Sequence, residues 1–480
     1  MKLATKIAYN TIIQIISKII TTVLGLVAIA VITRYLGTKG FGEYTTIITF
    51  LSFFAIMADL GLTLVTVQLI SQPGADEDKI LGNLLGLRLV SALIFIGSGP
   101  IFVLFFPYSL AIKIGVALAA LSFFFIALNQ VLVGIFQKNL RMDKVSIAEI
   151  ISRIVLVAGI IFAVDGDYGI NGILIATVVS SFINFFFHYL FSRSFARIQL
   201  RFDLKYWNEI FKKSWPLALT IIFNLIYLKT DTLLLSMIER DSEIGIIAEV
   251  GLYGAAYKVI DVLITFPFMF AGIVLPVLTI AWAESNPQRF KNILQKSFDI
   301  MVILAVPLVV GTQLVAGDII KLVAGSDFAL AGPILRILIL ASGFIFLGNM
   351  FAHAVIALDK QRKIIGAYVF VAVTSLLGYI FLIPKYSYFG AAYVTIYSEA
   401  AIALASFYLV YKFTKFIPSF NVFAKSILAS LLMYLIIHFC YFNFTNNLFV
   451  ILGLAILSYS IILLALGGLK KEDLMALINK

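Results

Sequence analysis

Hydrophobic residues along this chain fall in long uninterrupted runs, and short segments with Lys, Arg, Asp, Gly or Pro separate one run from the next. Each run is about 20 residues or longer, the length of helix that crosses a bilayer. Inside hydrocarbon only a helix satisfies the backbone groups of a single segment, so the pattern predicts an all-α integral membrane protein. We expect about fourteen transmembrane helices, at residues 9–33, 42–69, 80–106, 109–136, 145–164, 170–192, 213–238, 247–281, 292–316, 331–357, 363–384, 388–411, 422–441 and 446–467.

Composition excludes a soluble protein. Hydrophobic residues make up 62% of the chain and charged residues 13%, whereas soluble domains carry about 25% charged residues. The net charge of +11 does not indicate a nucleic-acid partner, because the basic residues lie in short clusters between apolar runs, where loops face lipid headgroups.

The N-terminal apolar run and the few cysteine and histidine residues exclude further features. The first apolar run continues to about Ile32 without a small-residue cleavage pattern, so we expect a retained first helix rather than a signal peptide. With Cys440 as the single cysteine and three dispersed histidines, the sequence predicts no disulfide, no metal site and no cofactor.

The distribution of positive charge predicts the orientation. Of the 36 Lys and Arg residues, 25 fall on one side of the predicted membrane, six on the other and five within spans. The positive-inside rule therefore predicts a multi-pass protein of the cell (plasma or inner) membrane with both termini cytoplasmic. The longest connection, about residues 193–212, is basic, and we expect it to include an amphipathic segment on the membrane surface.

The chain contains an internal repeat. Gly42-Glu43-Tyr44 recurs in part as Gly251-Leu252-Tyr253, an offset of 209 residues. A second set recurs at an offset of 218: Tyr168, Gly172, Thr177 and Ser180 correspond to Tyr386, Gly390, Thr395 and Ser398. Both sets lie at equivalent junctions between predicted spans.

The repeat predicts three parts. Residues 1–205 form an N-terminal six-helix lobe, residues 206–415 a C-terminal six-helix lobe, and residues 416–480 two additional helices and a cytoplasmic tail. A six-helix half enters and leaves on the same side, so the two pseudo-symmetric bundles have parallel topology. This layout predicts a central cavity between the bundles, as in alternating-access carriers.

Three segments resemble the signatures of a known family. Thr33–Tyr44 resembles the first-loop signature of polysaccharide flippases in the multidrug/oligosaccharidyl-lipid/polysaccharide exporter superfamily, and so does Gly251–Lys258. A third match runs from Leu382–Tyr386 to Gly390–Ala392. The resemblance covers the whole chain, including the count of twelve helices plus two.

The resemblance implies a V-shaped carrier with two lobes and a central cavity, which moves undecaprenyl- or dolichyl-type diphosphate oligosaccharides outward. Ser387 and Gly378 stand where the third signature has Gly and a polar Asn. We interpret both departures as packing changes that leave the implied chemistry in place.

Charged residues within spans are the candidate site residues, because a charge in hydrocarbon usually marks a cavity or pathway. Lys18 in the first span and Lys229 in the seventh lie in equivalent helices of the two halves, and both are predicted to bind the diphosphate of a lipid carrier. Snorkelling to the headgroups is the alternative for a single Lys. The other candidate cavity cations are Arg88, Arg153, Lys258 and Arg336. Snorkelling or local pairing is the alternative for Arg88, Arg153 and Arg336, each of which lies near the end of a predicted helix.

Acidic residues within spans are candidates for coupling to a proton or sodium ion. Lys258 and Asp261 are three residues apart, and Glu149 and Arg153 four, so each pair can meet on one helical face and simply neutralise its charges. Asp231 is two residues from Lys229, so its side chain is expected to point to a different side of the helix from that of Lys229. Asp59 and Glu399 have no partner nearby in sequence and are the stronger coupling candidates, with Asp231 and Asp261 as the others.

Three functions fit to different degrees. An alternating-access flippase for polyprenyl-diphosphate-linked oligosaccharides is favoured, working as a monomer among membrane lipids, with glycosyltransferases or a polymerase of the same pathway as candidate partners. A cation-coupled multidrug exporter of the same superfamily is the alternative, although it favours an acidic cavity. A polysaccharide polymerase or ligase usually needs a sizeable outward loop carrying Arg or His, and the outward loops here are short. We therefore expect no enzyme.

Overall fold

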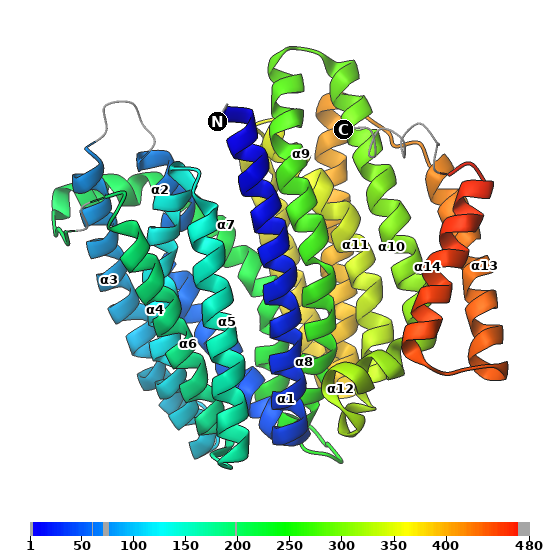
Figure 1. Ribbon diagram of the computed structural model, residues 1–480, viewed down its shortest axis with the longest axis horizontal. Coiled ribbons are helices and arrows are strands. Elements are labelled where there is room, and N and C mark those ends of the chain that lie inside the picture. Colours follow the sequence, from blue (N-terminus) through cyan, green and yellow to red (C-terminus); the bar gives the residue numbers. More distant parts are fainter. Residues whose placement is uncertain (1–2, 60, 71–75, 197–198, 469–480) are drawn as a thin grey trace. The chain divides into compact units, whose positions relative to one another are not determined.

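A computed structural model describes residues 3–59, 61–70, 76–196 and 199–468 of the 480-residue chain. The described residues form α-helices α1 to α14 and two short 3₁₀ turns, Val103–Phe105 and Ser326–Phe328, and contain no strand (Figure 1). This architecture confirms the predicted all-α membrane fold.

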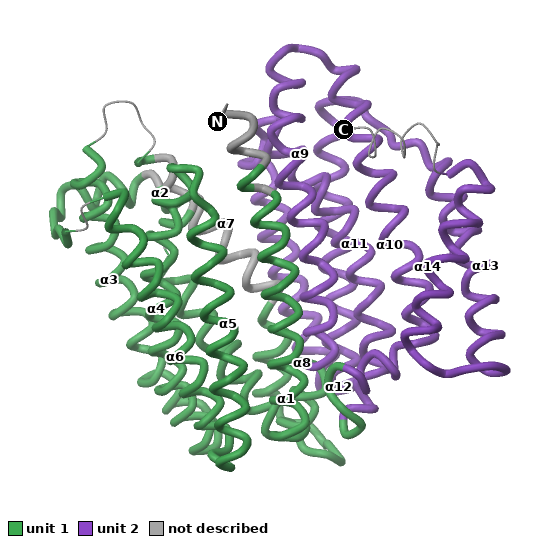
Figure 2. The backbone as a smooth tube through the Cα atoms, in the orientation of Figure 1, with its two compact units in different colours: residues 1–254, 323–327 green, residues 255–322, 328–480 purple. Residues whose placement is uncertain are grey.

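The helices belong to two compact units (Figure 2). Unit 1 comprises Met1–Gly254 and Val323–Asp327, and unit 2 comprises Ala255–Leu322 and Phe328–Lys480. Unit 1 contains α1 (Leu3–Asp59), α2 (Leu62–Ile70), α3 (Glu77–Phe102), α4 (Leu110–Lys138), α5 (Met142–Asp165), α6 (Gly169–Ser192), α7 (Leu204–Met237) and the first half of α8 (Ile246–Leu263). Unit 2 contains the rest of α8 with α9 (Thr265–Ala283), most of α10 (Pro287–Ala324), α11 (Ala331–Ala357), α12 (Gln361–Thr414), α13 (Asn421–Asn443) and α14 (Leu448–Ala465).

The number of spans agrees with the prediction. Eleven described stretches are long and apolar enough to cross a membrane. Two of them, Ile12–Asp59 and Gln361–Thr414, contain a kink with a non-helical residue, Gly37 and Ser387, and supply two spans each. Helix α7, at 34 residues, covers the span predicted at 213–238. The described residues thus supply a helix for each of the fourteen predicted spans.

One predicted span is interrupted. The sequence predicts a continuous helix over 42–69, but α1 ends at Asp59 and α2 begins at Leu62. Gly61 takes a φ of 73°, which glycine adopts without the steric cost of a Cβ. The break releases backbone carbonyls inside the membrane, where they need other donors. Arg88 supplies one, since its Nη1 donates to the Ala58 carbonyl at 3.1 Å.

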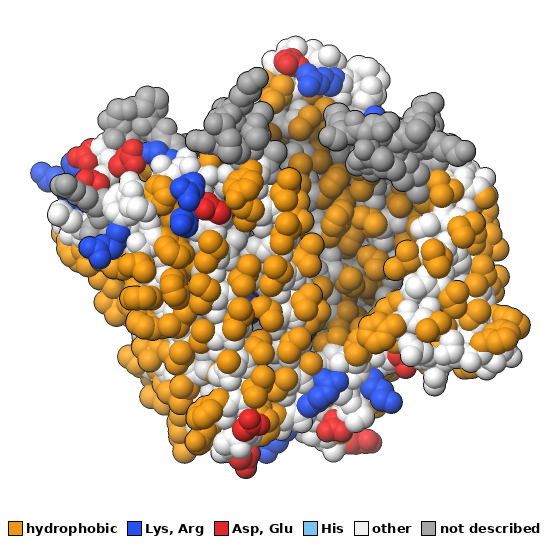
Figure 3. Space-filling model, in the orientation of Figure 1, with side chains coloured by type: hydrophobic (Ala, Val, Ile, Leu, Met, Phe, Trp, Pro, Cys, Tyr) orange, Lys and Arg blue, Asp and Glu red, His pale blue; other side chains and the backbone are white. Residues whose placement is uncertain are grey.

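The helix surfaces are suited to lipid. Along the helices visible in Figure 3, hydrophobic side chains cover the central stretches, and Lys, Arg, Asp and Glu gather near helix ends. Large apolar side chains such as Phe105, Leu110 and Phe162 are 70–82% exposed. A water-soluble surface rarely carries so much contiguous apolar area, whereas a bilayer covers it.

Each unit has its own buried core. In unit 1, Ile47, Leu51, Ile112, Val116 and Leu174 pack where α1, α4 and α6 meet. In unit 2, one cluster is built around Phe290, Phe346, Met350 and Val410 from α10, α11 and α12. A second cluster joins α13 and α14 to α10 through Val315, Met433, Ile437, Tyr459 and Leu463. The two helices predicted to stand outside the repeat therefore pack within unit 2.

The backbone repeats at equivalent positions. Gly169 and Ser387, 218 residues apart, both have positive φ, of 60° and 50°. Leu140 and Asp359, in the loops before the fifth and eleventh spans, also have positive φ, of 51° and 54°. The residue that departs from the expected Gly in the third signature, Ser387, thus occupies a conformation that favours Gly.

Helices α1 and α8 approach each other backbone to backbone in unit 1. A Cβ built on Gly42 falls 1.7 Å from the Ile247 carbonyl oxygen, so only glycine fits there. Helix α7 is also tied to the first helices, for example by Tyr108, whose hydroxyl lies 2.8 Å from that of Ser236. These contacts place α7 and the start of α8 in unit 1, so the compact units and the predicted repeat halves are different divisions of the chain.

Candidate functional site

Helices α1 and α5 are joined at both ends of their common length. At one end, the Asn10 side chain donates to the Leu140 carbonyl at 2.7 Å and accepts from the backbone N–H of Met142 at 2.8 Å. At the other end, the Tyr35 hydroxyl donates to Asp167 at 2.7 Å. Both Asn10 to Tyr35 and Met142 to Asp167 span 25 residues. The two helices therefore run parallel and in register.

This register brings three charged side chains to the same level. Lys18 lies eight residues beyond Asn10, and Glu149 lies seven residues beyond Met142, which corresponds to about 10–12 Å along each helix. The Glu149 carboxylate interacts electrostatically with both Lys18 and Arg153. All three side chains are exposed in the structure. We call Lys18, Glu149 and Arg153 the charge cluster.

A polar seam fixes the rotation of α5. Ser152, beside Arg153, is buried against α6, where the Ser180 hydroxyl donates to the Ser152 carbonyl at 2.7 Å. The Asn184 amide donates to the Ser152 hydroxyl at 2.9 Å. Because neighbouring residues of a helix point about 100° apart, this seam directs Arg153 away from α6. Arg153 instead interacts electrostatically with Tyr44 of α1.

The charge cluster is positively charged overall. Two cations and one carboxylate leave a net charge of one positive unit. Arg153 lies eleven residues into α5, about 16 Å along a span whose hydrocarbon is about 30 Å thick. Charged side chains at that depth usually line a water-filled pathway or pair with one another.

Arg88 and Asp59 form a buried ion pair inside unit 1. Arg88 is 1% exposed, and its Nη2 lies 2.6 Å from Asp59 Oδ1. Its remaining donors reach the Ala127 carbonyl at 2.9 Å, the Ala58 carbonyl, and the side chains of Thr63 and Gln130. The structure thus places this predicted cavity cation in the interior, and it gives Asp59 the partner that the sequence does not show.

Lys229 and Asp231 differ in burial, as their spacing of two residues predicts. Asp231 is 1% exposed and accepts from the Tyr253 hydroxyl at 2.7 Å and from the backbone N–H of Thr232. Lys229 is half-buried. The two charges nevertheless interact electrostatically.

The other predicted residues lie in unit 2. Lys258 and Asp261 form the ion pair that their i, i+3 spacing predicts, at 3.5 Å, and each side chain is about a third exposed. Arg336 is exposed on α11. Glu399, on α12, is 7% exposed and interacts electrostatically with Tyr368.

Sequence reasoning missed a second buried ion pair. Arg240, one of the six basic residues predicted on the outward side, binds Glu249 through its Nε at 2.9 Å and also through Nη2. Both side chains are less than 10% exposed, and the Ser242 hydroxyl donates to Glu249 at 3.0 Å. The acidic Glu249 near the start of a predicted span was the available signal. Across the residues that the structure describes, no three His, Cys, Asp or Glu side chains are grouped to hold a metal ion.

Similar folds occur among solved membrane transporters. A lipid II flippase, MurJ, in an inward closed conformation aligns at a TM-score of 0.75 and 18% identity, covering 93% of this chain and 97% of that one. An inward-facing multidrug resistance MATE family transporter of the MOP superfamily aligns at 0.69 and 16%, covering 84% and 98%. A MOP superfamily transporter from Pyrococcus furiosus aligns at 0.59 and 16%, covering 85% and 95%. At these identities, the likeness shows a shared fold.

Sequence comparison identifies the family. No curated protein sequence matches the chain. A family model described as "Polysaccharide biosynthesis protein" matches residues 7–282, which is more than half of the 480 residues. The matched region contains the charge cluster, the Arg88–Asp59 pair and the crossing at Gly42. The chain therefore belongs to the polysaccharide biosynthesis protein family of multi-pass membrane proteins.

Proposed function

We propose that this protein is a flippase that moves polyprenyl-diphosphate-linked oligosaccharides outward across the cell membrane by alternating access. The observation that carries the proposal is the charge cluster at mid-span, in which Glu149 interacts electrostatically with both Lys18 and Arg153. Family membership supports a role in building polysaccharide. The fold shared with a lipid II flippase supports a lipid-linked substrate.

The charge cluster suits a diphosphate. A guanidinium binds phosphate oxygens in a bidentate manner, and an ammonium on a flexible stem adapts to their position. In the absence of substrate, Glu149 neutralises part of the positive charge. When a diphosphate enters, it takes the place of the carboxylate as the partner of both cations. Lys229 is the candidate cation of the second sequence half.

Alternating access requires the two sequence halves to separate on one side. Gly42 belongs to the first half and Gly251 to the second, and they lie at the backbone contact of α1 with α8. We propose that this contact opens during the transport cycle. The Lys258–Asp261 and Arg88–Asp59 pairs have structural roles in this account, and Arg336 is an auxiliary cation.

Coupling to an ion needs a group that changes its charge or ligand during transport. Asp231 and Glu399, which are both buried on spanning helices, are the candidates. Asp231 has the more complete set of contacts, because Tyr253 and Thr232 hold its two oxygens. Protonation of Asp231 would free Lys229 from its electrostatic partner and make it available to the substrate.

A deletion strain tests the proposal. We expect polyprenyl-diphosphate oligosaccharides to accumulate on the cytoplasmic face of the membrane, and expression of this chain to relieve the accumulation. Normal outward delivery in a strain without a redundant carrier would contradict the proposal. Loss of drug resistance in that strain, with normal surface polysaccharide, would instead indicate a multidrug exporter.

A further inference from the structure

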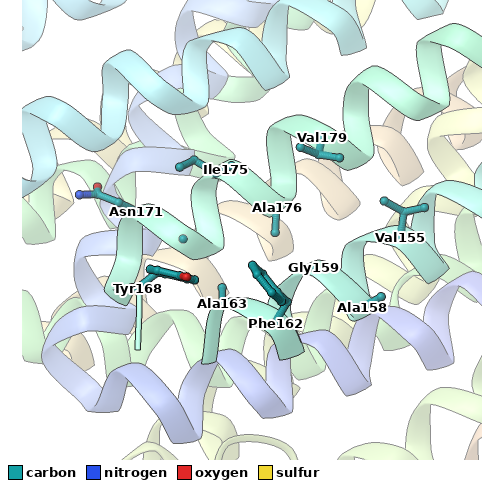
Figure 4. A pocket seen from close by; sticks show the side chains of 11 residues that line it. Val155, Ala158, Gly159, Phe162, Ala163, Tyr168, Asn171, Ile175, Ala176 and Val179 are labelled. Atoms are coloured by element: carbon teal, nitrogen blue, oxygen red, sulfur yellow. The ribbon is translucent and has the colours of Figure 1, made fainter. Parts of the chain in front are cut away.

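An apolar groove of about 690 Å³ lies between α5 and α6 (Figure 4). Val155, Phe162, Ile175 and Val179 are among the side chains that line it, and its only polar side chains are those of Tyr168 and Asn171. The volume is within the range of pockets that bind small ligands. Both helices span the membrane, so hydrocarbon rather than water surrounds the groove.

Small residues create the hollow. Gly159 packs against Ala176, with a built Cβ 3.0 Å from the Ala176 Cβ, and Gly172 packs against Ala163 at the same distance. These contacts hold the two helices close at the floor of the groove. Ala158, which is exposed on its wall, leaves the space above that floor open. An apolar hollow in hydrocarbon forfeits packing contacts unless a chain fills it.

The groove has a distinct mouth at the turn from α5 to α6. The rings of Phe162 and Tyr168 lie 5.9 Å apart there, and the Tyr168 ring rests against Gly166. Aromatic side chains of this kind mark the level of the lipid headgroups. Asn171 lines the groove on the same side. A lipid in the groove would thus have its headgroup at the turn and one chain pointing toward the bilayer centre.

The charge at the mouth selects the headgroup. Asp165 and Asp167 flank the turn and are exposed. Residues 154–192, which include both groove-lining segments, contain these two carboxylates and no Lys or Arg. Asp167 also accepts from Tyr35, which holds its carboxylate in place. By Coulomb attraction and repulsion, these carboxylates favour an ammonium group over an anionic headgroup.

We propose that the α5–α6 groove is a binding site for one membrane phospholipid with a primary amine headgroup, of the phosphatidylethanolamine class. One hydrocarbon chain fills the groove, and the ammonium group lies beside Asp165 and Asp167. The lipid belongs to the leaflet on the side of the 166–168 turn. The site is separate from the proposed diphosphate site, and its test requires no sugar substrate.

Lipid retention by the purified full-length protein tests the site. The protein is incubated in mild detergent with equimolar phosphatidylethanolamine and phosphatidylglycerol of the same chains, and bound lipid is measured by native mass spectrometry. We expect phosphatidylethanolamine to be retained in several-fold excess. Equal retention of both lipids, or preference for phosphatidylglycerol, would overturn the proposal.

Two variants test the groove itself. Ala158→Phe fills the groove, and we expect it to lower retention of phosphatidylethanolamine several-fold. Ile161→Phe places the same ring on an exposed position of α5 outside the groove, and it should retain lipid as the wild type does. Undiminished retention by Ala158→Phe would contradict the proposal.

The double variant Asp165→Asn, Asp167→Asn tests headgroup selection. We expect it to keep a bound lipid while losing the preference for phosphatidylethanolamine. Both residues are exposed, and the amide oxygen of an Asn at 167 can still accept from Tyr35, so this variant decides the question even if Ala158→Phe does not fold. An unchanged preference in this variant would overturn the assignment of the headgroup.

Discussion

Gly42 and Gly251 pack against each other's helix with two-fold symmetry. A Cβ on Gly42 would fall 1.7 Å from the Ile247 carbonyl oxygen, and one on Gly251 would fall 2.0 Å from the Thr38 carbonyl oxygen. Each glycine thus meets the carbonyl four residues before the other glycine, and both Thr38 to Ile247 and Gly42 to Gly251 are separated by 209 residues. The contact joins equivalent positions of the two repeats, as an isologous interface joins two subunits.

Substituting Gly42 should open this contact. In Gly42→Ala the added methyl overlaps a backbone carbonyl, and we expect the helices to separate at a cost of about 1–3 kcal/mol. A cysteine at the buried Thr45, with Cys440 replaced by Ser, reports the separation through its rate of reaction with a water-soluble maleimide. Gly25→Ala is the matched control on α1, because no neighbouring atom lies within 4 Å of its Cβ. An unchanged labelling rate in Gly42→Ala would contradict the symmetric contact.

A disulfide across the same crossing should arrest transport. The Cβ built on Gly254 lies 3.4 Å from the Thr45 Cβ, close to the spacing of about 3.5–4.5 Å found in disulfides. We expect Thr45→Cys, Gly254→Cys in a Cys440→Ser background to lose flipping on oxidation and regain it on reduction. Each single cysteine should be insensitive to oxidant. Full activity of the completely cross-linked protein would show that this contact does not open during transport.

The Arg88–Asp59 pair should affect stability rather than substrate binding. Arg88→Met leaves a buried carboxylate without its cation, at an expected cost of about 3–5 kcal/mol of unfolding free energy. The double variant Arg88→Met, Asp59→Asn removes both charges and should be more stable than Arg88→Met alone. Thermal unfolding in detergent measures the difference. Wild-type stability of Arg88→Met combined with lost transport would identify Arg88 as a substrate contact instead.

Replacing Ser387 with glycine should stabilise the protein. Its φ of 50° and ψ of −132° match the first central position of a type II′ turn, which favours Gly. We expect Ser387→Gly to raise the unfolding free energy by about 1 kcal/mol, since a side chain at positive φ costs about that amount or more. Ser375→Gly, in the same helix at a buried position, should instead lower it by about 0.5–1 kcal/mol. A lower melting temperature for Ser387→Gly would show that the Ser387 side chain stabilises the turn by more than its strain costs.

The sequence predicts the fold well because hydrophobic length is a strong signal in a membrane. The span predicted at 331–357 has the same bounds as α11. The break at Gly61 escapes prediction, because a glycine within an apolar run does not by itself reveal that a distant Arg88 will cap the freed carbonyl. A β-rich or water-soluble protein would not have apolar runs of this length, so the sequence does not favour either fold.

The site is less predictable than the fold. The Lys258–Asp261 pair follows from i, i+3 spacing, since both residues lie on one helix. The approach of Lys18 to Glu149 depends on the register of α1 and α5, which Asn10 and Tyr35 set through contacts with residues 130 and 132 positions away in sequence. Asp59, at the end of α1, likewise pairs with Arg88 on another helix, α3. Pairs between helices therefore require the structure, whereas pairs within a helix do not.

The central claim is that Lys18 and Arg153 bind the diphosphate of a lipid-linked oligosaccharide. The most direct test measures flipping of a polyprenyl-diphosphate oligosaccharide by the purified protein in proteoliposomes, for the wild type, Lys18→Gln and Arg153→Gln. Lys113→Gln, a change of the same kind at a helix end, is the matched control. We predict flipping by the wild type and the control, and a loss of about tenfold or more in each cluster variant, because a hydrogen bond to a charged group contributes about 1.5–3 kcal/mol. Wild-type flipping by both cluster variants, or no flipping by the folded wild-type protein, would contradict the account.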